Sequence, residues 1–275
     1  MQVIGVTGPS NAGKTTLVET LLERLCERGT VGTVKHIDCE PSVDTEGKDT
    51  DRHRRAGAVR THGIADESWF ATGQSRTLWD ALEDLSVDCE YAVVEGYADL
   101  DLPQIVLGTE ADTDAMLAAP SVEAVSIEEA LEAIESVEPY ESLSSLVASV
   151  EASADAERAG AIATFTGRVR RRDSPDDEPT EYLEFEAYDA VATERMETIR
   201  ADLEARDGVF DVQLHHRTGT VQAGEDVVHV VVLAGHREEA FRAVEDGIDR
   251  LKDEVPLFKK EVTVSGEFWA HEQSG

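Results

Sequence analysis

The segment GPSNAGKT, from Gly8 to Thr15, decides how the first half of the chain folds. It fits the phosphate-loop pattern GxxxxGK(S/T) at every specified position. The preceding residues, Val3–Thr7, predict a short buried strand, and the following residues repeat leucine and valine at helical spacing until Gly29. Strand, glycine loop and helix in this order place backbone N–H groups and the positive end of a helix around a phosphate chain.

We therefore expect a nucleotide site in this loop. Lys14 would reach the β- and γ-phosphates, and Thr15 would hold Mg²⁺. The residues expected to bind the nucleotide are Gly8, Asn11, Ala12, Gly13, Lys14, Thr15 and Thr16. A glycine-rich turn that matches the pattern by chance is the alternative, which the flanking strand and helix disfavour.

Further apolar segments alternate with helical ones up to about residue 137. The predicted strands are Val31–His36, Tyr91–Glu95, Ile105–Leu107 and Val122–Val125, and the last predicted helix is Ile127–Ser136. This alternation predicts an α/β fold with a mostly parallel sheet, whose ligands bind at the carboxyl ends of the strands. Glu95 ends such a strand and is a candidate for Mg²⁺ or water positioning, with a plain surface carboxylate as the alternative. The sequence has no NKxD segment for guanine, so the residues alone leave the base open.

The charge of the chain limits its function. A length of 275 residues suits about two domains. The 58 acidic and 25 basic side chains give a net charge of −33, with −17 in residues 1–137 and −16 in residues 138–275. This balance excludes a basic nucleic-acid-binding surface. An even excess is typical of a halophile's protein, since at molar salt the Debye length falls to about 3 Å; a basic partner is the alternative.

Lysine and cysteine usage add to this picture. Only six of the 25 basic residues are lysine, so each retained lysine is a candidate for chemistry that arginine cannot supply. These lysines are Lys14, Lys35, Lys48, Lys252, Lys259 and Lys260. Three cysteines without a CxxC pair indicate neither a disulfide framework nor a zinc site, and suit a reducing cytoplasm. The longest apolar stretch, Val227–Gly235, is far shorter than the ~18 residues that cross a membrane.

The second half has a different order of elements. The predicted strands are Ala161–Thr166, Tyr182–Ala187, Val212–Arg217, Val227–Leu233 and Glu261–Val264, and the predicted helices are Leu143–Ala152, Ala190–Ala205 and Glu238–Asp253. Because turns as well as helices join these strands, an α+β fold is expected. Glu138-Pro139 marks the boundary, so the expected domains are residues 1–137 and 138–275.

Basic residues gather at strand ends in this half. After Gly167, the five residues Arg168–Arg172 include four arginines, and strand alternation puts Arg168 and Arg170 on one side, where they could hold an anion. A solvated basic turn is the alternative. His-Arg pairs at His216-Arg217 and His236-Arg237 also follow strands and weakly indicate an anion site. No spacing of His and Cys here predicts a bound metal.

The remaining lysines are candidates for catalysis. Lys252 is offset from the apolar stripe of its helix, and Pro256 then turns the chain into a strand. Lys259 and Lys260 point to opposite faces of that strand, so only one would join Lys252. A desolvated lysine beside other cations has a lowered pKa and can act as acid, base or nucleophile. The alternative for Lys252 is a favourable charge at a helix end.

The first half resembles the molybdopterin-guanine dinucleotide biosynthesis adapter family (MobB type). The resemblance rests on GPSNAGKT, VKHIDCEPSVDTEGKDTDRHRRAGA from Val34, AVVEGY from Ala92 and LPQIVL from Leu102. It implies a protein that binds GTP with Mg²⁺ and assists the guanylyltransferase that attaches GMP to molybdopterin. The chain departs from the family pattern at Asp38 and Cys39, where histidines are expected, and at Tyr97-Ala98, where Phe-Lys is expected.

The second half resembles the catalytic large subunit of molybdopterin synthase (MoaE type). The resemblance rests on GAIATFTGRVR, LEFEAY, HHRTGTVQAGE, GHREEAFRAV and DRLKDEVPLFKKE. It implies conversion of cyclic pyranopterin monophosphate to molybdopterin by a homodimer. Two sulfurs come from the C-terminal Gly-Gly thiocarboxylate of a ubiquitin-like small subunit. The implied catalytic residues are Lys252 and Lys259, and the implied anion-binding residues are Arg170, His236 and Arg237. Phe258 and Val191 replace the family's common Trp and Met.

The combined expectation is a fusion that acts in molybdenum-cofactor synthesis. One alternative is a non-catalytic scaffold that docks the carrier, against which the intact lysine pair argues. Another makes the first half a small-molecule kinase. A carrier tail activated beside these lysines could also form an isopeptide bond to Lys252, Lys259 or Lys260.

Overall fold

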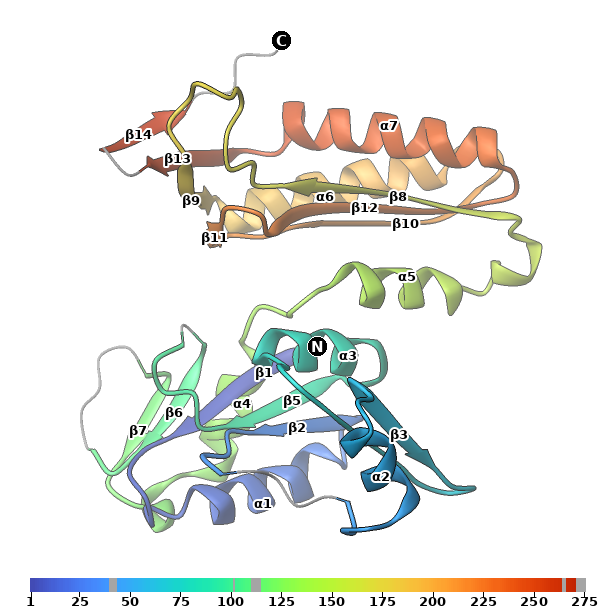
Figure 1. The fold of residues 1–275 in the computed structure, drawn as a ribbon. Helices are drawn as coiled ribbons and strands as arrows, with labels where there is room; N and C mark the ends of the chain where they lie inside the picture. The colour runs from blue at the N-terminus through green and yellow to red at the C-terminus, as the bar shows by residue number, and fades with distance from the viewer. Residues whose placement is uncertain (40–43, 101, 110–114, 264–265, 271–275) are drawn as a thin grey trace. The chain divides into compact units, whose positions relative to one another are not determined.

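The computed structural model describes residues 1–39, 44–100, 102–109, 115–263 and 266–270. The chain divides into two compact units, Met1–Tyr140 and Glu141–Gly275 (Figure 1). In the described residues, no helix combines the length and the apolar character needed to cross a membrane.

The first unit is a three-layer α/β structure around a parallel sheet, as predicted. Its strands, in spatial order, are β2 (Val31–Lys35), β5 (Tyr91–Glu95), β1 (Gln2–Thr7), β6 (Gln104–Leu107) and β7 (Leu117–Ala119). Helices α1 (Lys14–Leu25) and α4 (Ile127–Glu135) share one apolar core with the sheet, and α3 (Leu78–Asp88) shares another. Because the strands run parallel, β1, β2 and β5 end at one edge, where the phosphate loop lies.

Several elements of this unit differ from the sequence prediction. The strand predicted at Val122–Val125 is wrong: the outer strand is β7, and Val122–Ala124 is a single 3-10 turn, η1. Val122 and Val125 are three residues apart, a spacing that suits a helical turn better than strand alternation. Helix α2 (Asp49–Arg55), helix α3 and the hairpin of β3 (Arg60–Ile64) and β4 (Trp69–Gly73) were not predicted.

The second unit is α+β, as predicted, and contains two antiparallel sheets. One has the order β10 (Val209–His216), β12 (Asp226–Ala234) and β8 (Ala161–Arg168), and the other has β11 (Gly219–Gln222), β9 (Thr180–Ala187), β13 (Leu257–Thr263) and β14 (Gly266–Ala270). The end of the strand predicted to reach Val264 lies outside the described residues.

Helices cover the three-stranded sheet of the second unit on both faces. Helices α6 (Asp189–Glu204) and α7 (Arg237–Glu254) pack with Val228, Val230 and Val232 of β12, whereas α5 (Leu143–Glu151) packs with the alternating Val231 and Leu233. Strand β12 is buried along nearly its whole length, which explains its almost continuous apolar sequence.

Because each unit has its own core, we expect the two to unfold independently. Leu21 of α1 and Ile199 of α6 are fully buried in different cores. Leu21→Ala should lower the stability of the first unit, and Ile199→Ala that of the second, by about 2–5 kcal/mol each. Calorimetry in molar KCl should show two transitions, each moved by one variant alone. A single transition lowered equally by both variants would contradict independent cores.

Candidate functional site

The phosphate loop joins β1 to α1 in a conformation that needs glycine. Gly8 and Gly13 have φ angles of 134° and 91°, in the left-handed region. A Cβ atom on Gly8 would lie 2.4 Å from the carbonyl oxygen of Leu107, and one on Gly13 would lie 2.9 Å from Cγ1 of Val122. The loop is thus fixed against β6 and η1, with its backbone free of side chains at both glycines.

Cationic and acidic groups meet beside this loop. Lys14 Nζ donates to the carbonyl oxygens of Gly8 and Pro9, both at 2.8 Å. Thr15 Oγ1 donates to Glu95 Oε1 at 3.0 Å. The structure therefore brings Thr15 and Glu95 together across α1 and β5, and their role toward a metal stays a prediction.

One hydroxyl and one carboxylate fit Mg²⁺, which usually takes its other ligands from water and nucleotide phosphates. Among the residues that the structure describes, no group of three or more His, Cys, Asp or Glu side chains could hold a metal ion by itself. A metal at Thr15 and Glu95 would therefore depend on a bound nucleotide for further ligands.

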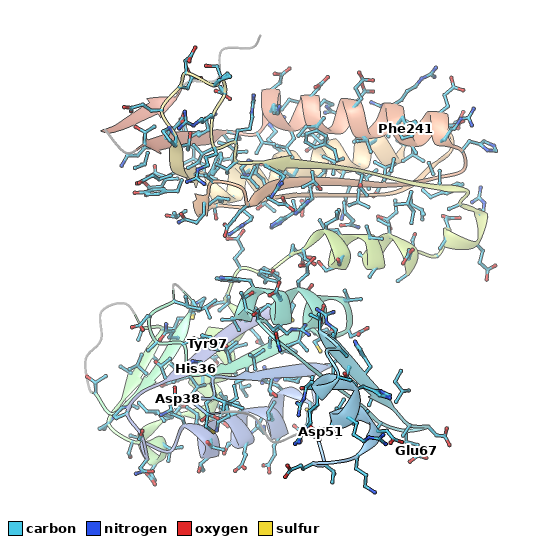
Figure 2. All side chains as sticks on the ribbon, viewed as in Figure 1. His36, Asp38, Asp51, Glu67, Tyr97 and Phe241 are labelled. Carbon is cyan, nitrogen blue, oxygen red and sulfur yellow. The ribbon has the colours of Figure 1, made fainter. Side chains whose placement is uncertain are left out.

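Two of the residues at which the first half departs from its family pattern, Asp38 and Tyr97, lie close to His36. The ring of Tyr97 lies 4.9 Å from the ring of His36, and Tyr97 has a left-handed φ of 60°. Nδ1 of His36 lies 3.6 Å from Oδ1 of Asp38. Figure 2 labels His36, Asp38 and Tyr97 near the same edge of the sheet.

A buried carboxylate organises α2. Asp51 is 2% exposed, accepts a hydrogen bond from the Gly47 amide at 2.8 Å, and pairs with Arg54 and Arg55 at 3.0 and 2.9 Å. The Gly47 hydrogen bond, followed by those of the two arginines, lowers the pKa of Asp51. The family motif around Gly47 and Arg54 thus includes contacts that hold this segment together.

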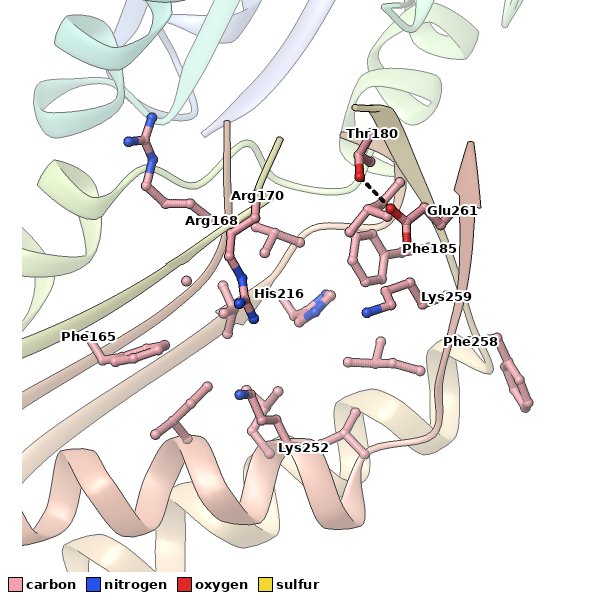
Figure 3. A pocket seen from close by; sticks show the side chains of 18 of the residues that line it. Phe165, Arg168, Arg170, Thr180, Phe185, His216, Lys252, Phe258, Lys259 and Glu261 are labelled. Carbon is pink, nitrogen blue, oxygen red and sulfur yellow. Dashed lines mark hydrogen bonds between the residues drawn. The ribbon is translucent and has the colours of Figure 1, made fainter. Parts of the chain in front are cut away.

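The second unit contains a cavity of about 430 Å³ between the end of α7 and the sheet of β9 and β13. Lys252 reaches it from the last turn of α7, Lys259 from β13 and Arg170 from the loop after β8, whereas the guanidinium of Arg168, at the end of β8, points away from it (Figure 3). Three cationic side chains from three parts of the sequence thus converge in a chain of net charge −33.

Strand alternation places the neighbouring Lys259 and Lys260 on opposite faces of β13, as predicted. Lys259 lines the cavity, whereas Nζ of Lys260 lies 3.5 Å from Oε2 of Glu184 on the adjacent strand β9. Lys259 opposes Phe185 in the register, and Lys260 opposes Glu184, so the two lysines project to opposite faces.

The two arginines are arranged differently from the prediction, which placed Arg168 and Arg170 on one side of a strand. Strand β8 ends at Arg168, so Arg170 lies in the following loop and strand alternation does not align the two. Arg168 Nε donates to Asp226 at 2.9 Å, and Nη1 of Arg170 lies 3.0 Å from Asp173. Arg170 is exposed, so its guanidinium can turn toward a bound anion.

Thr180 and Glu261 line the cavity but were not predicted as site residues, whereas His216 was weakly indicated by its His-Arg pair. Glu261 accepts a hydrogen bond from Thr180, and both line the cavity. His216 also lines it, with Nδ1 2.8 Å from the Arg217 carbonyl oxygen. Glu261 is two residues after Lys259, so the period of the strand could have identified it.

The other predicted anion-binding residues do not join this cavity within one chain. His236 is the N-cap of α7 and Arg237 its first residue, whereas Lys252 lies in the last turn. Lys252 follows Arg237 by fifteen residues of continuous helix, or about 22 Å. A single small anion therefore cannot bridge these groups in one chain.

Two family models match the chain. The model for molybdopterin guanine dinucleotide synthesis protein B (MobB) matches residues 3–128, and the MoaE protein model matches residues 140–254. A probable molybdopterin synthase of Haloferax volcanii is 45% identical over 274 residues, which are 99% of this chain and 100% of the relative. A molybdopterin synthase catalytic subunit of Pyrococcus abyssi is 43% identical over 110 residues, which are 40% of this chain and 73% of the relative. The crystal structure of a molybdopterin synthase from Staphylococcus aureus aligns with 49% of this chain and 93% of its own, at 32% identity and a TM-score of 0.43.

The phosphate loop leads to a prediction for nucleotide binding. Lys14→Ala should weaken binding of a fluorescent nucleoside triphosphate by about tenfold or more, because a charged hydrogen bond to phosphate is lost. Arg24→Ala, which removes an exposed charge from the far end of α1, is the matched control and should bind normally. Equal affinities of the Lys14 and Arg24 variants would contradict a nucleotide site in this loop.

Proposed function

The chain belongs to the molybdopterin synthase family and joins a MobB-type unit to a MoaE-type unit, and from this premise we propose that it acts in molybdenum-cofactor synthesis. Residues 138–275 would be the catalytic domain. This domain would convert cyclic pyranopterin monophosphate to molybdopterin with two sulfurs from a thiocarboxylated ubiquitin-like small subunit. The observation that supports this proposal is the cavity in which Lys252 and Lys259 lie with Arg170.

The three cationic residues of the cavity, Arg170, Lys252 and Lys259, each have a chemical role in this proposal. Arg170 would bind the cyclic phosphate, since a guanidinium matches phosphate in a planar, bidentate geometry. Sulfur addition and ring opening need a group that donates protons and a group that accepts them, or a transient amine adduct. Lys252 and Lys259 would fill these roles, and the carrier's Gly-Gly tail would bring the thiocarboxylate to them. Water would replace each transferred sulfur and return the tail to a carboxylate.

We propose that two copies of the chain complete one site. His236 and Arg237 begin α7, about 22 Å from Lys252 along the helix. A homodimer could bring these two residues of one copy to the cavity of the other, where they would add cationic groups for the phosphate. The proposal thus assigns anion-binding roles to His236 and Arg237 despite their distance from Lys252 within one chain.

For residues 1–137 we propose binding of GTP with Mg²⁺, slow hydrolysis, and assistance to the guanylyltransferase that adds GMP to molybdopterin. The geometry of Lys14, Thr15 and Glu95 supports a nucleotide site. A small-molecule kinase is the alternative, and transfer of phosphate to a small acceptor would identify it. A preference for ATP over GTP in equilibrium binding would contradict the assignment of GTP.

The two lysines should not tolerate arginine. Lys252→Arg should lose nearly as much synthase activity as Lys252→Ala, at least about a hundredfold, because arginine stays protonated and cannot exchange a proton. Lys260→Arg, on the opposite face of β13, is the matched control and should remain active. The measurement is molybdopterin formation in molar KCl, and near-normal turnover by Lys252→Arg would refute a proton-exchanging or nucleophilic lysine.

Mixing variants tests the shared site. Lys252→Ala and His236→Ala chains should each be inactive, but a mixed dimer has one cavity with both residues intact. After random re-association, roughly a quarter of the wild-type activity should return. No recovery, with mixed dimers demonstrated by mass spectrometry, would contradict a site completed by the second copy.

A further inference from the structure

Lys35 occupies a specific position beside the phosphate loop. Its Nζ lies 2.9 Å from Glu95 Oε1, donates to Glu95 Oε2 at 3.1 Å, and donates to Thr15 Oγ1 at 3.4 Å. These are the two side chains expected to hold Mg²⁺. The ammonium of Lys35 is therefore a cation placed directly beside Thr15 and Glu95.

The sheet explains why this contact forms. Lys35 and Glu95 are the last residues of β2 and β5, and they are direct partners in the parallel register. The Glu95 side chain is only 11% exposed, so its charge needs a nearby cation, whereas the Lys35 side chain is 52% exposed. Lys14 donates to the carbonyl oxygens of its own loop. Lys35 is thus paired with Glu95 and has room to turn away.

We propose that Lys35 is a γ-phosphate ligand that rests on Glu95 until a magnesium nucleotide binds; this proposal rests on nucleotide binding by the first unit. Mg²⁺ at Thr15 and Glu95 would repel the ammonium, which lies within 3.4 Å of both side chains. A metal in this position bridges the β- and γ-phosphates, so the terminal phosphate is the nearest anion for the displaced Lys35. No covalent bond changes in this step.

This exchange makes Lys35 a sensor of the third phosphate. With a nucleoside triphosphate, the ammonium of Lys35 moves from the carboxylate of Glu95 to the γ-phosphate and stays paired with an anion. With a diphosphate, it has no γ-phosphate to bind, so it competes with Mg²⁺ for Glu95. The triphosphate should therefore bind more tightly, and Mg²⁺ should be harder to bind with the diphosphate.

The test is equilibrium binding of fluorescent GTP and GDP analogues to the full chain in molar KCl, with Mg²⁺ varied. Lys35→Met keeps the length of the side chain but removes its charge. It should lower the ratio of GTP to GDP affinity about tenfold, the loss expected for one charged hydrogen bond. The Mg²⁺ concentration needed for half-maximal effect with GDP should fall severalfold. Arg24→Ala removes one positive charge from the same unit and should change neither quantity.

Lys35→Gln is a second variant, chosen in case Lys35→Met does not fold. The glutamine amide has no charge but can still donate a hydrogen bond to Glu95. Melting curves without nucleotide should show that this variant is folded, and it should lose the GTP preference as Lys35→Met does. A folded variant with the wild-type affinity ratio and the wild-type Mg²⁺ dependence would overturn the proposal and leave Lys35 as an ion-pair partner only. If the wild-type chain bound neither GTP nor GDP, nucleotide binding itself would fail, which is a distinguishable result.

Discussion

The turn between α7 and β13 is the constraint on which the candidate synthase site depends. Helix α7 ends at Glu254 and β13 begins at Leu257, with Pro256 between them. Proline cannot continue a helix, so the chain bends into β13, and Lys259 lies across the cavity from Lys252 (Figure 3). The period of β13 then decides that Lys259, and not Lys260, enters the cavity. A shift of one residue in the register of β13 would turn Lys260 into the cavity and Lys259 away from it.

Charge gives the two candidate sites a common character. In a chain of net charge −33, cations are concentrated where anionic ligands are expected, at the phosphate loop and in the cavity of the second unit. Many other basic side chains form exposed ion pairs, such as Arg24–Glu128 and Arg242–Glu238, which contribute little individually. At molar salt such exposed pairs are screened, whereas groups in a cavity keep more of their interaction.

Local patterns predicted most of the fold. The phosphate loop and the parallel strands followed from contiguous motifs, and the opposite orientations of Lys259 and Lys260 followed from the strand period. The strand predicted at Val122 was wrong because two valines three residues apart suit a helical turn better than strand alternation. The hairpin of β3 and β4 was missed since its strands are only five residues long and do not alternate apolar with polar residues. The distance of His236 from Lys252 could be predicted from the length of α7 alone. The closeness of Lys35 to Glu95 could not, because it depends on which strands are neighbours in the sheet.

Sulfur transfer to a pterin is the activity proposed for the second unit. To test it, the purified chain would receive thiocarboxylated carrier and cyclic pyranopterin monophosphate in molar KCl, and both product and spent carrier would be measured. We expect two thiocarboxylates to be consumed for each molybdopterin formed. A folded, carrier-bound chain that consumes no thiocarboxylate would contradict it and favour a scaffold that docks the carrier without chemistry.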